Sequence, residues 1–276
     1  MYKGFLRKIG YLFIFFSPVI LNASPIFQKE FFNIQGGIYL HEINEKEYFD
    51  GYTLNGKNLL TIKKNDRFYL IYGIPYGISP GVKEIIISNV NSKKSLKLTI
   101  NKTKFGRQDI TVSKTYTKPS EKNIERIIKE KNIISKYRNT WSKRDPDIEF
   151  IYPVKGRVTG VFGTERYYNG EKGRYHNGID IAASINTAIV APSSGKVILT
   201  GDFFYNGKFV YIDHGKGLLS VFIHLNEINT SQGKFVKKGE LIGKIGSTGR
   251  STGPHVHWSV ILNQNYVNPM VFLTNN

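Results

Sequence analysis

The sequence predicts a mostly β protein with a small N-terminal β-sandwich-like domain, a helical linker and a C-terminal all-β domain built from antiparallel sheet. Three observations predict this organisation. Short alternating apolar runs with turn signals between them recur before residue 115, one segment near 118–141 has helical periodicity, and the chain after residue 150 is β-like and rich in glycine. We place the accessory domain at 24–115, the linker at 116–149 and the C-terminal domain at 150–276, which suits a chain of 276 residues.

The composition supports folded domains and excludes all chemistry that depends on cysteine. Apolar residues make up 40% of the chain, which contains 18 Phe and 17 Tyr, enough to build hydrophobic cores. The chain has no cysteine, so disulfides, thiolate metal sites, a cysteine nucleophile and a lipid-modified N-terminal cysteine are excluded. Any metal ion must therefore be held by histidine and carboxylate.

The first 23 residues have the pattern of a signal peptide. Lys3, Arg7 and Lys8 precede the apolar runs 11–16 and 19–21, and Ala23 offers a small residue for cleavage. The apolar segment is shorter than the roughly 20 residues that a membrane span needs. Export with cleavage is the favoured prediction, and a retained anchor that keeps the protein beside a membrane is the alternative. Both place the body of the protein outside the cytoplasm, in the periplasm or associated with the cell envelope.

The protein is strongly basic, and this limits the class of partner. The formal net charge is +18, and removing residues 1–23 with their three cations would leave +15. For an exported protein, such a charge favours attraction to the cell wall or to anionic membrane surfaces. The sequence contains no long Lys/Arg run or recognition motif that would predict binding to nucleic acid.

The accessory domain is predicted to be a small antiparallel sandwich. Asn55-Gly56 is a strong hairpin signal, and turn residues separate the apolar runs on either side of it. The predicted strands are Leu59–Ile62, Arg67–Tyr72, Lys83–Val90, Leu96–Ile100 and Ile110–Val112. Nothing in this region predicts catalysis.

A single amphipathic helix is predicted for the linker. Ser120 is a plausible N-cap, and Lys, Glu and Arg alternate with apolar residues after it. The predicted apolar stripe consists of Ile124, Ile127, Ile128, Ile134, Tyr137 and Trp141. We expect this helix to be a connector that packs on one or both domains.

The C-terminal domain is predicted to be all-β, and it contains five of the six histidines. Asn206-Gly207 is a second hairpin signal. The predicted strands are Arg157–Phe162, Gly178–Ala182, Ala188–Val190, Gly195–Thr200, Lys208–Asp213, Leu219–His224, Leu241–Ile245 and Pro254–Leu262. The concentration of histidine makes this domain the place to look for chemistry.

Two histidines begin the last of these strands. His255 and His257 are two residues apart, so on a strand both side chains project from the same face. Two converging imidazoles suit a metal site or a proton-transfer site. Two solvated histidines at a strand end are the alternative.

An imidazole and a carboxylate lie four residues apart upstream. In the stretch from His176 to Asp180, the β-like sequence predicts a loop that enters a strand, where both side chains share one side. With His257 they form a set of two histidines and one carboxylate, which with an open fourth position is typical of a catalytic zinc site. A plain ion pair between His176 and Asp180 is the alternative.

The motifs together resemble the lysostaphin/LytM-type (M23) zinc metallopeptidases. The similar segments stand in the order of the family and cover roughly residues 150 to 270. They are Gly160–Gly163, His176–Ile181, Ala191–Val197, Asp213–Gly215, His224-Leu225 and Gly246–His257.

The resemblance implies a Zn²⁺ cofactor and a division of roles among the site residues. It makes His176, Asp180 and His257 the zinc ligands and His224 and His255 the catalytic histidines that do not bind the metal. One of this pair would act as base and the other would bind the developing oxyanion, in an order that the sequence leaves open.

Two further positions near the site follow from the same resemblance. The family treats the position of His214 as structural, so we keep this residue out of the site. The chain departs from the family at Phe222, where a tyrosine is usual, so a contact around the site could be altered although no ligand is lost.

The function implied is that of an exported zinc-dependent endopeptidase that hydrolyses peptide bonds of peptidoglycan, in a stem peptide or a cross-bridge, during cell-wall remodelling. The alternative is a non-catalytic wall-binding module or an activator of another cell-wall hydrolase. Relatives of that kind typically lack ligands, whereas this chain retains all five site residues. We also expect Gly249, in the glycine-rich stretch before the H-x-H, to form part of a groove wall that an extended substrate approaches.

Overall fold

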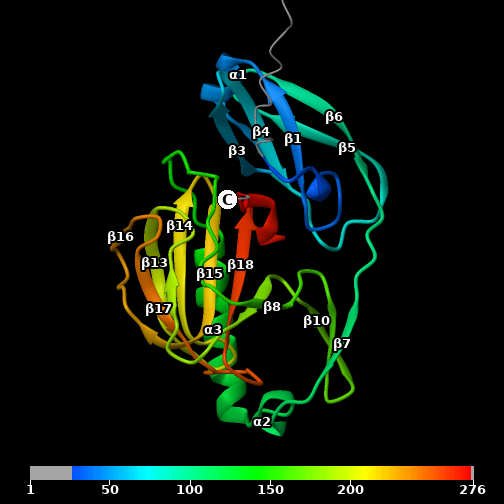
Figure 1. Ribbon diagram of the computed structural model, residues 1–276. Helices are drawn as coiled ribbons and strands as arrows, with labels where there is room; N and C mark the ends of the chain where they lie inside the picture. Colours follow the sequence, from blue (N-terminus) through cyan, green and yellow to red (C-terminus); the bar gives the residue numbers. More distant parts are fainter. Residues whose placement is uncertain (1–26, 275–276) are drawn as a thin grey trace, which may run out of the picture.

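Two β-rich parts are stacked end to end, and the segment that connects them runs along one side (Figure 1). The structure is a computed structural model that describes residues 27–274, so the predicted signal peptide lies outside the described residues. Within 27–274, no helix combines the length and the apolar character needed to cross a membrane. The strands pair almost entirely antiparallel, which confirms the predicted mostly β fold.

The first part is a six-stranded sheet in the order β1-β4-β3-β2-β5-β6. Asn55 and Gly56 both have positive φ and join β2 to β3, which confirms the predicted hairpin. The elements are η1 (Lys29–Phe31), β1 (Ile38–Ile43), α1 (Glu45–Asp50), β2 (Tyr52–Leu54), β3 (Lys57–Lys64), β4 (Arg67–Gly73), β5 (Gly81–Ser88) and β6 (Lys93–Ile100). Strand β1 and helix α1 are absent from the list of predicted elements.

Strand β3 joins the two halves of this sheet, because it pairs with a different neighbour along each half of its length. Its first half pairs with β2 and its second half, from Leu60, pairs with β4. The two halves of the sheet contribute to one core, in which Leu59, Leu70, Ile87 and Leu98 are buried together. The predicted sandwich is therefore a single continuous sheet whose two halves enclose this core.

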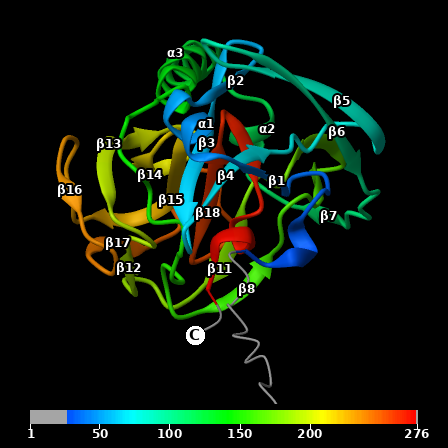
Figure 2. The same cartoon turned by 90° about the horizontal axis from the view of Figure 1, so that it is seen from above.

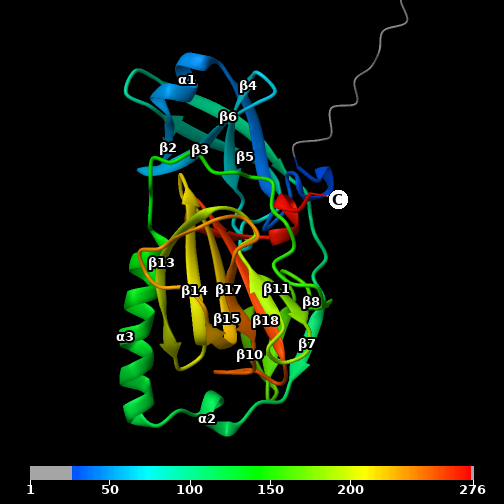
Figure 3. The same cartoon turned by 60° about the vertical axis from the view of Figure 1, so that its left-hand side comes forward.

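The segment 101–149, which contains the predicted linker 116–149 and is called the linker from here on, runs the length of the second part and then returns. From the six-stranded sheet it passes through β7 (Arg107–Ile110) to α2 (Lys114–Thr117) at the far end, and α3 (Glu121–Arg138) leads back beside β13 (Figures 1 and 3). The Ser120 side chain accepts a hydrogen bond from the backbone N–H of Asn123, which confirms the predicted N-cap.

The predicted apolar stripe of α3 is only partly buried. Ile134 and Tyr137 pack against the sheet, whereas Ile124 and Ile128 remain 45% and 54% exposed. Trp141 lies beyond the end of the helix. The buried residue of α3 is Glu130, whose carboxylate accepts a hydrogen bond from the backbone N–H of Phe204 at 2.8 Å. The helix is therefore attached to the sheet by a polar contact as well as by apolar packing.

The second part is a ten-stranded sheet whose main path is β16-β13-β14-β15-β18-β11-β8. Its strands are β8 (Arg157–Gly160), β11 (Ile179–Ala182), β12 (Ala188–Val190), β13 (Gly195–Phe203), β14 (Gly207–Gly215), β15 (Leu218–Ile228), β16 (Phe235–Val236), β17 (Leu241–Ile245), β18 (His255–Leu262) and β19 (Asn265–Val267), followed by η2 (Pro269–Phe272). Each strand predicted after residue 150 has a counterpart here. The Asn206-Gly207 signal marks the β13–β14 connection, where Phe203 pairs with Gly207.

A three-stranded sheet on the flank of the second part was not predicted. Strands β9 (Glu165–Tyr168) and β10 (Glu171–Tyr175) form a hairpin, and the linker strand β7 pairs with β9 in parallel. The hairpin turn is Asn169-Gly170, and both residues have positive φ. This dipeptide is a hairpin signal, but the residues around it are largely charged and lack the apolar alternation that predicts a strand.

The two parts share a continuous hydrophobic core where they meet. Seen from above, β3 and β4 lie over the ends of β15 and β18 (Figure 2). Four buried residues of the six-stranded sheet belong to the same apolar cluster as the core of the ten-stranded sheet: Ile38, Leu60, Ile62 and Ile71. The side-chain amide of Asn263, between β18 and β19, accepts from Gly73 N–H and donates to the carbonyl oxygen of Asn58.

Candidate metal centre

The site forms where strands β11 and β18 lie side by side. They pair antiparallel, with Asp180 directly opposite His257 and Ala182 opposite His255. Residues opposite each other in an antiparallel pair project from the same face, so the register brings the carboxylate to the imidazole. Strand β18 begins at the end of the sheet away from the six-stranded part (Figure 1).

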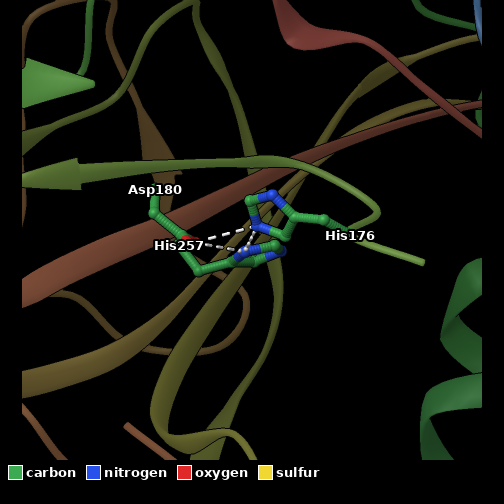
Figure 4. Close-up of side chains that lie close together, drawn as sticks. All are labelled: His176, Asp180 and His257. Atoms are coloured by element: carbon green, nitrogen blue, oxygen red, sulfur yellow. Dashed lines mark hydrogen bonds and ion pairs between the residues drawn. The ribbon is translucent and has the colours of Figure 1, made fainter. Parts of the chain in front are cut away.

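Three side-chain atoms converge at one point, as Figure 4 shows. His176 Nε2 lies 2.9 Å from Asp180 Oδ1 and 2.8 Å from His257 Nδ1, and His257 Nδ1 lies 2.8 Å from Asp180 Oδ1. All three residues are buried. The structure therefore brings together the three residues that the sequence predicts as ligands.

The outward ring nitrogens of both histidines have their own partners. His176 Nδ1 donates to the carbonyl oxygen of Val161 at 2.8 Å. His257 Nε2 lies 2.7 Å from Ser259 Oγ, and that hydroxyl donates to Asn177. These contacts place the ring protons on the outer nitrogens, so two lone pairs and a carboxylate oxygen face one another. A cation is what such a set of acceptors requires, and hydrogen bonds on the outer nitrogen are typical of metal-binding histidines.

The protonation of the site suits a bound cation. Burial alone would raise the pKa of Asp180, but the hydrogen bonds and positive charge that the two imidazoles offer in their protonated form outweigh burial and hold its pKa well below the ordinary value. Burial lowers the pKa of His257 to about 4, although Asp180 opposes that shift. Near pH 7 the carboxylate is therefore ionised and His257 is neutral, which is the state in which each binds a metal ion.

Arg166 also reaches this site, and sequence reasoning missed it. Its Nη2 donates to Asp180 Oδ2, the carboxylate oxygen that does not face the histidines. The Arg166 side chain is only 13% exposed and extends from the unpredicted β9–β10 hairpin. Because the hairpin was not predicted, nothing in the sequence placed this arginine near the cluster.

His224 and His255 lie beside the cluster as a second pair. Their ring centroids are 4.9 Å apart, and His255 Nε2 is 3.8 Å from Asp180 Oδ1. His224 Nδ1 donates to the carbonyl oxygen of Thr248, and His255 Nδ1 to that of Gly253, each at 2.8 Å. These bonds leave the Nε2 lone pair of each ring without a proton. Burial, with the neighbouring His255 and His257, lowers the pKa of His224 to about 3.

His224 has a strained backbone that surrounding contacts hold in place. Its φ is +70°, a left-handed conformation that residues other than glycine adopt only rarely. Its backbone N–H donates to the carbonyl oxygen of Asn206 at 2.9 Å, and its ring is held by Thr248. Strain of this kind at a predicted catalytic residue is typical of functional sites.

Gly249 packs closely against a neighbouring connection of the sheet. A Cβ atom at Gly249 would lie 2.2 Å from the backbone nitrogen of Gly207 and 2.6 Å from the carbonyl oxygen of Tyr205, and its φ is +68°. The missing side chain therefore lets the loop before β18 pack on the β13–β14 connection. This packing and the positive φ require a glycine here.

The two remaining sequence predictions concern buried residues away from the cluster. His214 is fully buried, with Nδ1 donating to the carbonyl oxygen of Ser194 and Nε2 2.8 Å from Ser220 Oγ, as expected for a structural residue. Phe222 is also fully buried and stacks on Trp258, with ring centroids 6.2 Å apart and planes inclined by 6°. A tyrosine hydroxyl would have no solvent there, so the departure at Phe222 suits this core.

Comparison with known proteins decides the family. The model of peptidase family M23 matches residues 174–269, which include His176, Asp180, His224, His255 and His257. The crystal structure of a Pseudomonas aeruginosa protein assigned to peptidase M23 is 30% identical and superposes with a TM-score of 0.71. The match covers 87% of this chain and 94% of that one. The chain belongs to peptidase family M23.

The matches to two curated relatives each cover less than half of this chain. The peptidoglycan DD-endopeptidase ShyA of Vibrio cholerae is 37% identical over 122 residues, which are 43% of this chain and 28% of ShyA. The DD-carboxypeptidase/endopeptidase Mpg of Neisseria meningitidis is 38% identical over 117 residues, which are 42% of this chain and 27% of Mpg. The chain thus spans little more than a quarter of the length of these relatives.

Membership of M23 identifies the cation that the cluster suits. The family consists of zinc metallopeptidases, and the His176, Asp180 and His257 cluster can hold a metal ion. Two imidazole nitrogens and one carboxylate oxygen are ligands that zinc prefers, and three protein ligands leave a coordination position open.

Proposed function

We propose that this protein is an exported zinc-dependent endopeptidase that hydrolyses peptide bonds of peptidoglycan, in stem peptides or cross-bridges. The observation that carries the proposal is the convergence of His176, Asp180 and His257 on one point, with His224 and His255 beside it. The first three residues would hold zinc and the other two would act on the substrate.

The paired histidines are prepared for proton chemistry. Both donate their Nδ1 proton to a backbone carbonyl oxygen, so each presents a free Nε2 lone pair. One imidazole can take the proton of the attacking water and later give it to the leaving amine. The other, once protonated, can donate a hydrogen bond to the oxygen of the tetrahedral intermediate. Zinc, when bound, would polarise the scissile carbonyl and lower the pKa of water toward 7.

The substrate class is supported by the relatives and by the charge. ShyA is named a peptidoglycan DD-endopeptidase, and Mpg is named a DD-carboxypeptidase/endopeptidase. The formal charge of +18 favours approach to an anionic cell wall. The signal-like residues 1–23 would direct the chain to the envelope, where that polymer lies.

Digestion of purified peptidoglycan tests the proposal. Residues 24–276 loaded with zinc should release muropeptides whose masses show a cut peptide bond, and addition of a chelator should stop the release. His257→Ala, which lacks one of the three converging atoms, should release none. Stoichiometric zinc without any cleavage by the wild-type chain would refute the enzyme and support a wall-binding module instead.

A further inference from the structure

The carboxylate of Asp180 makes contacts on two sides. Its Oδ1 faces His176 and His257, while its Oδ2 accepts a hydrogen bond from Arg166 Nη2. Arg166 is 13% exposed and the Asp180 side chain 11%, so water screens this ion pair little. The arginine thus fixes the oxygen that points away from the histidines.

Strand β8 leaves space for this ion pair. Gly160 lies opposite Asp180 in the β8–β11 pairing. A Cβ atom at Gly160 would lie 2.4 Å from Asp180 Oδ2 and 3.0 Å from Arg166 Nη2. Any larger residue would push the carboxylate or the guanidinium out of place, so the glycine is required by the pair.

The linker holds the other side of the guanidinium. Arg166 Nε donates to Gln108 Oε1 at 3.2 Å, and these two residues are direct partners in the parallel β7–β9 pairing. Arg166 therefore connects the linker to the metal cluster, with Nε bonded to Gln108 and Nη2 bonded to Asp180. A lysine lacks this rigid fork of separated donors, so it is a poorer bridge between the two acceptors.

Further bonds fix the linker to the hairpin on both sides of Gln108. Before it, Glu165 N–H donates to the carbonyl oxygen of Gly106 at 2.8 Å. After it, the Asn169 side chain accepts from Val112 N–H and donates to the carbonyl oxygen of Val112, each at 3.0 Å. Gln108 is therefore held at a defined position, although it lies outside the M23 match that begins at residue 174.

We propose that the linker strand β7 is a structural part of the zinc site, with Gln108 orienting Arg166 and Arg166 orienting the ligand carboxylate of Asp180. Arg166 and Gln108 are positioning residues, since neither contacts the substrate in this scheme. The proposal rests on the proposed zinc-binding role of His176, Asp180 and His257. It assigns part of the metal affinity to a segment that precedes the M23 match.

Two opposite effects of the arginine make the proposal testable. Holding the carboxylate in one orientation spares zinc the entropic cost of ordering it, and loss of such outer contacts typically weakens metal binding about 10- to 100-fold. The positive charge of Arg166 acts in the other direction, because it repels a dication. The proposal states that orientation outweighs repulsion.

Zinc affinity of the chain from residue 24 onward, measured by competition with a chromogenic chelator, tests this balance. Arg166→Ala should bind zinc about 10- to 100-fold more weakly than wild type, and Arg166→Lys should fall between them. Gln108→Ala should lose about three- to tenfold, as expected for one lost hydrogen bond. Asp109→Ala is the matched control on β7: this exposed carboxylate bonds to Arg107 and lies on the opposite face of the strand from Gln108, so its loss should leave zinc affinity unchanged.

A double-mutant cycle separates positioning from general loosening of the fold. If Gln108 acts through Arg166, the double variant should bind zinc as Arg166→Ala does, without a further loss. Thermal melts of the zinc-free proteins would identify any variant that fails to fold. Tighter zinc binding by Arg166→Ala, or fully additive losses in the cycle, would overturn the proposal. A wild-type chain that binds no zinc would refute the proposed metal site itself.

Discussion

The substitutions His257→Ala and His255→Ala should separate metal binding from catalysis, although the two residues lie on the same face of β18. His257 Nδ1 lies 2.8 Å from both Asp180 Oδ1 and His176 Nε2. His255 Nε2 stands 3.8 Å from Asp180 Oδ1, beyond hydrogen-bonding distance. The first substitution removes one of three converging ligand atoms, and the second removes none.

The size of each effect follows from these contacts. Structural zinc sites with four ligands bind with about 12 kcal/mol, so one ligand contributes about 3 to 4 kcal/mol. His257→Ala should therefore weaken zinc binding roughly a hundred- to a thousandfold. His255→Ala should change zinc affinity less than about tenfold, while kcat falls by about 10² to 10⁴, the usual contribution of a general acid or base.

Two measurements on the same preparations check this prediction. Chelator competition gives the zinc dissociation constant, and release of soluble muropeptides at saturating zinc gives the turnover rate. His214→Asn serves as a control for the loss of a histidine outside the site. Equal loss of zinc by His255→Ala and His257→Ala would refute the division of roles, and so would a fully active His255→Ala.

Three further predictions concern the surroundings of the site and the fold. Gly249→Val should lower kcat and leave zinc content unchanged, because the added side chain would displace the loop that holds His224; unchanged turnover would contradict it. Burial lowers the pKa of His214 to about 4, so its NMR resonances should show a neutral ring down to about pH 5. Because the unfolded chain takes up this proton near pH 6.5 and the folded protein only near pH 4, the free energy of unfolding should fall by about 3 kcal/mol between these two pH values. A His214 resonance that titrates near pH 6.5 would contradict this. Asn263→Ala should lower the free energy of unfolding by about 1 to 3 kcal/mol in urea, since it removes the bond to Gly73; a change below about 0.5 kcal/mol would show that this junction contributes little.

Strand periodicity in the sequence predicts part of the metal cluster, and the resemblance to M23 peptidases supplies which histidines bind the metal. His255 and His257 share a strand face by parity alone, and the His176–Asp180 spacing fits a loop that enters a strand. The two-residue repeat of a strand does not predict which other strand pairs with it. The β11–β18 register that puts Asp180 against His257 depends on tertiary packing.

The surroundings of the cluster were harder to predict, for two physical reasons. Arg166 reaches Asp180 from a charged hairpin without apolar alternation, and its partner Gln108 lies 58 residues earlier in the chain. Glu130 looks like an ordinary exposed residue of an amphipathic helix, yet it is buried against Phe204 N–H. Long-range polar contacts of this kind have no periodic signature, whereas hydrophobic cores do.

The shared core at the junction has a consequence for how the site can be opened or closed. Swinging the six-stranded part away would expose the aliphatic side chains of Ile38, Leu60, Ile62 and Ile71. At about 1.5 kcal/mol or more for each, such a state costs about 6 kcal/mol and is populated by about one molecule in 25,000. The six-stranded part therefore keeps its position relative to the ten-stranded sheet. Changes in access to the zinc site are therefore expected to come from the loops around it, because the six-stranded part and the hairpin that carries Arg166 are both held in place.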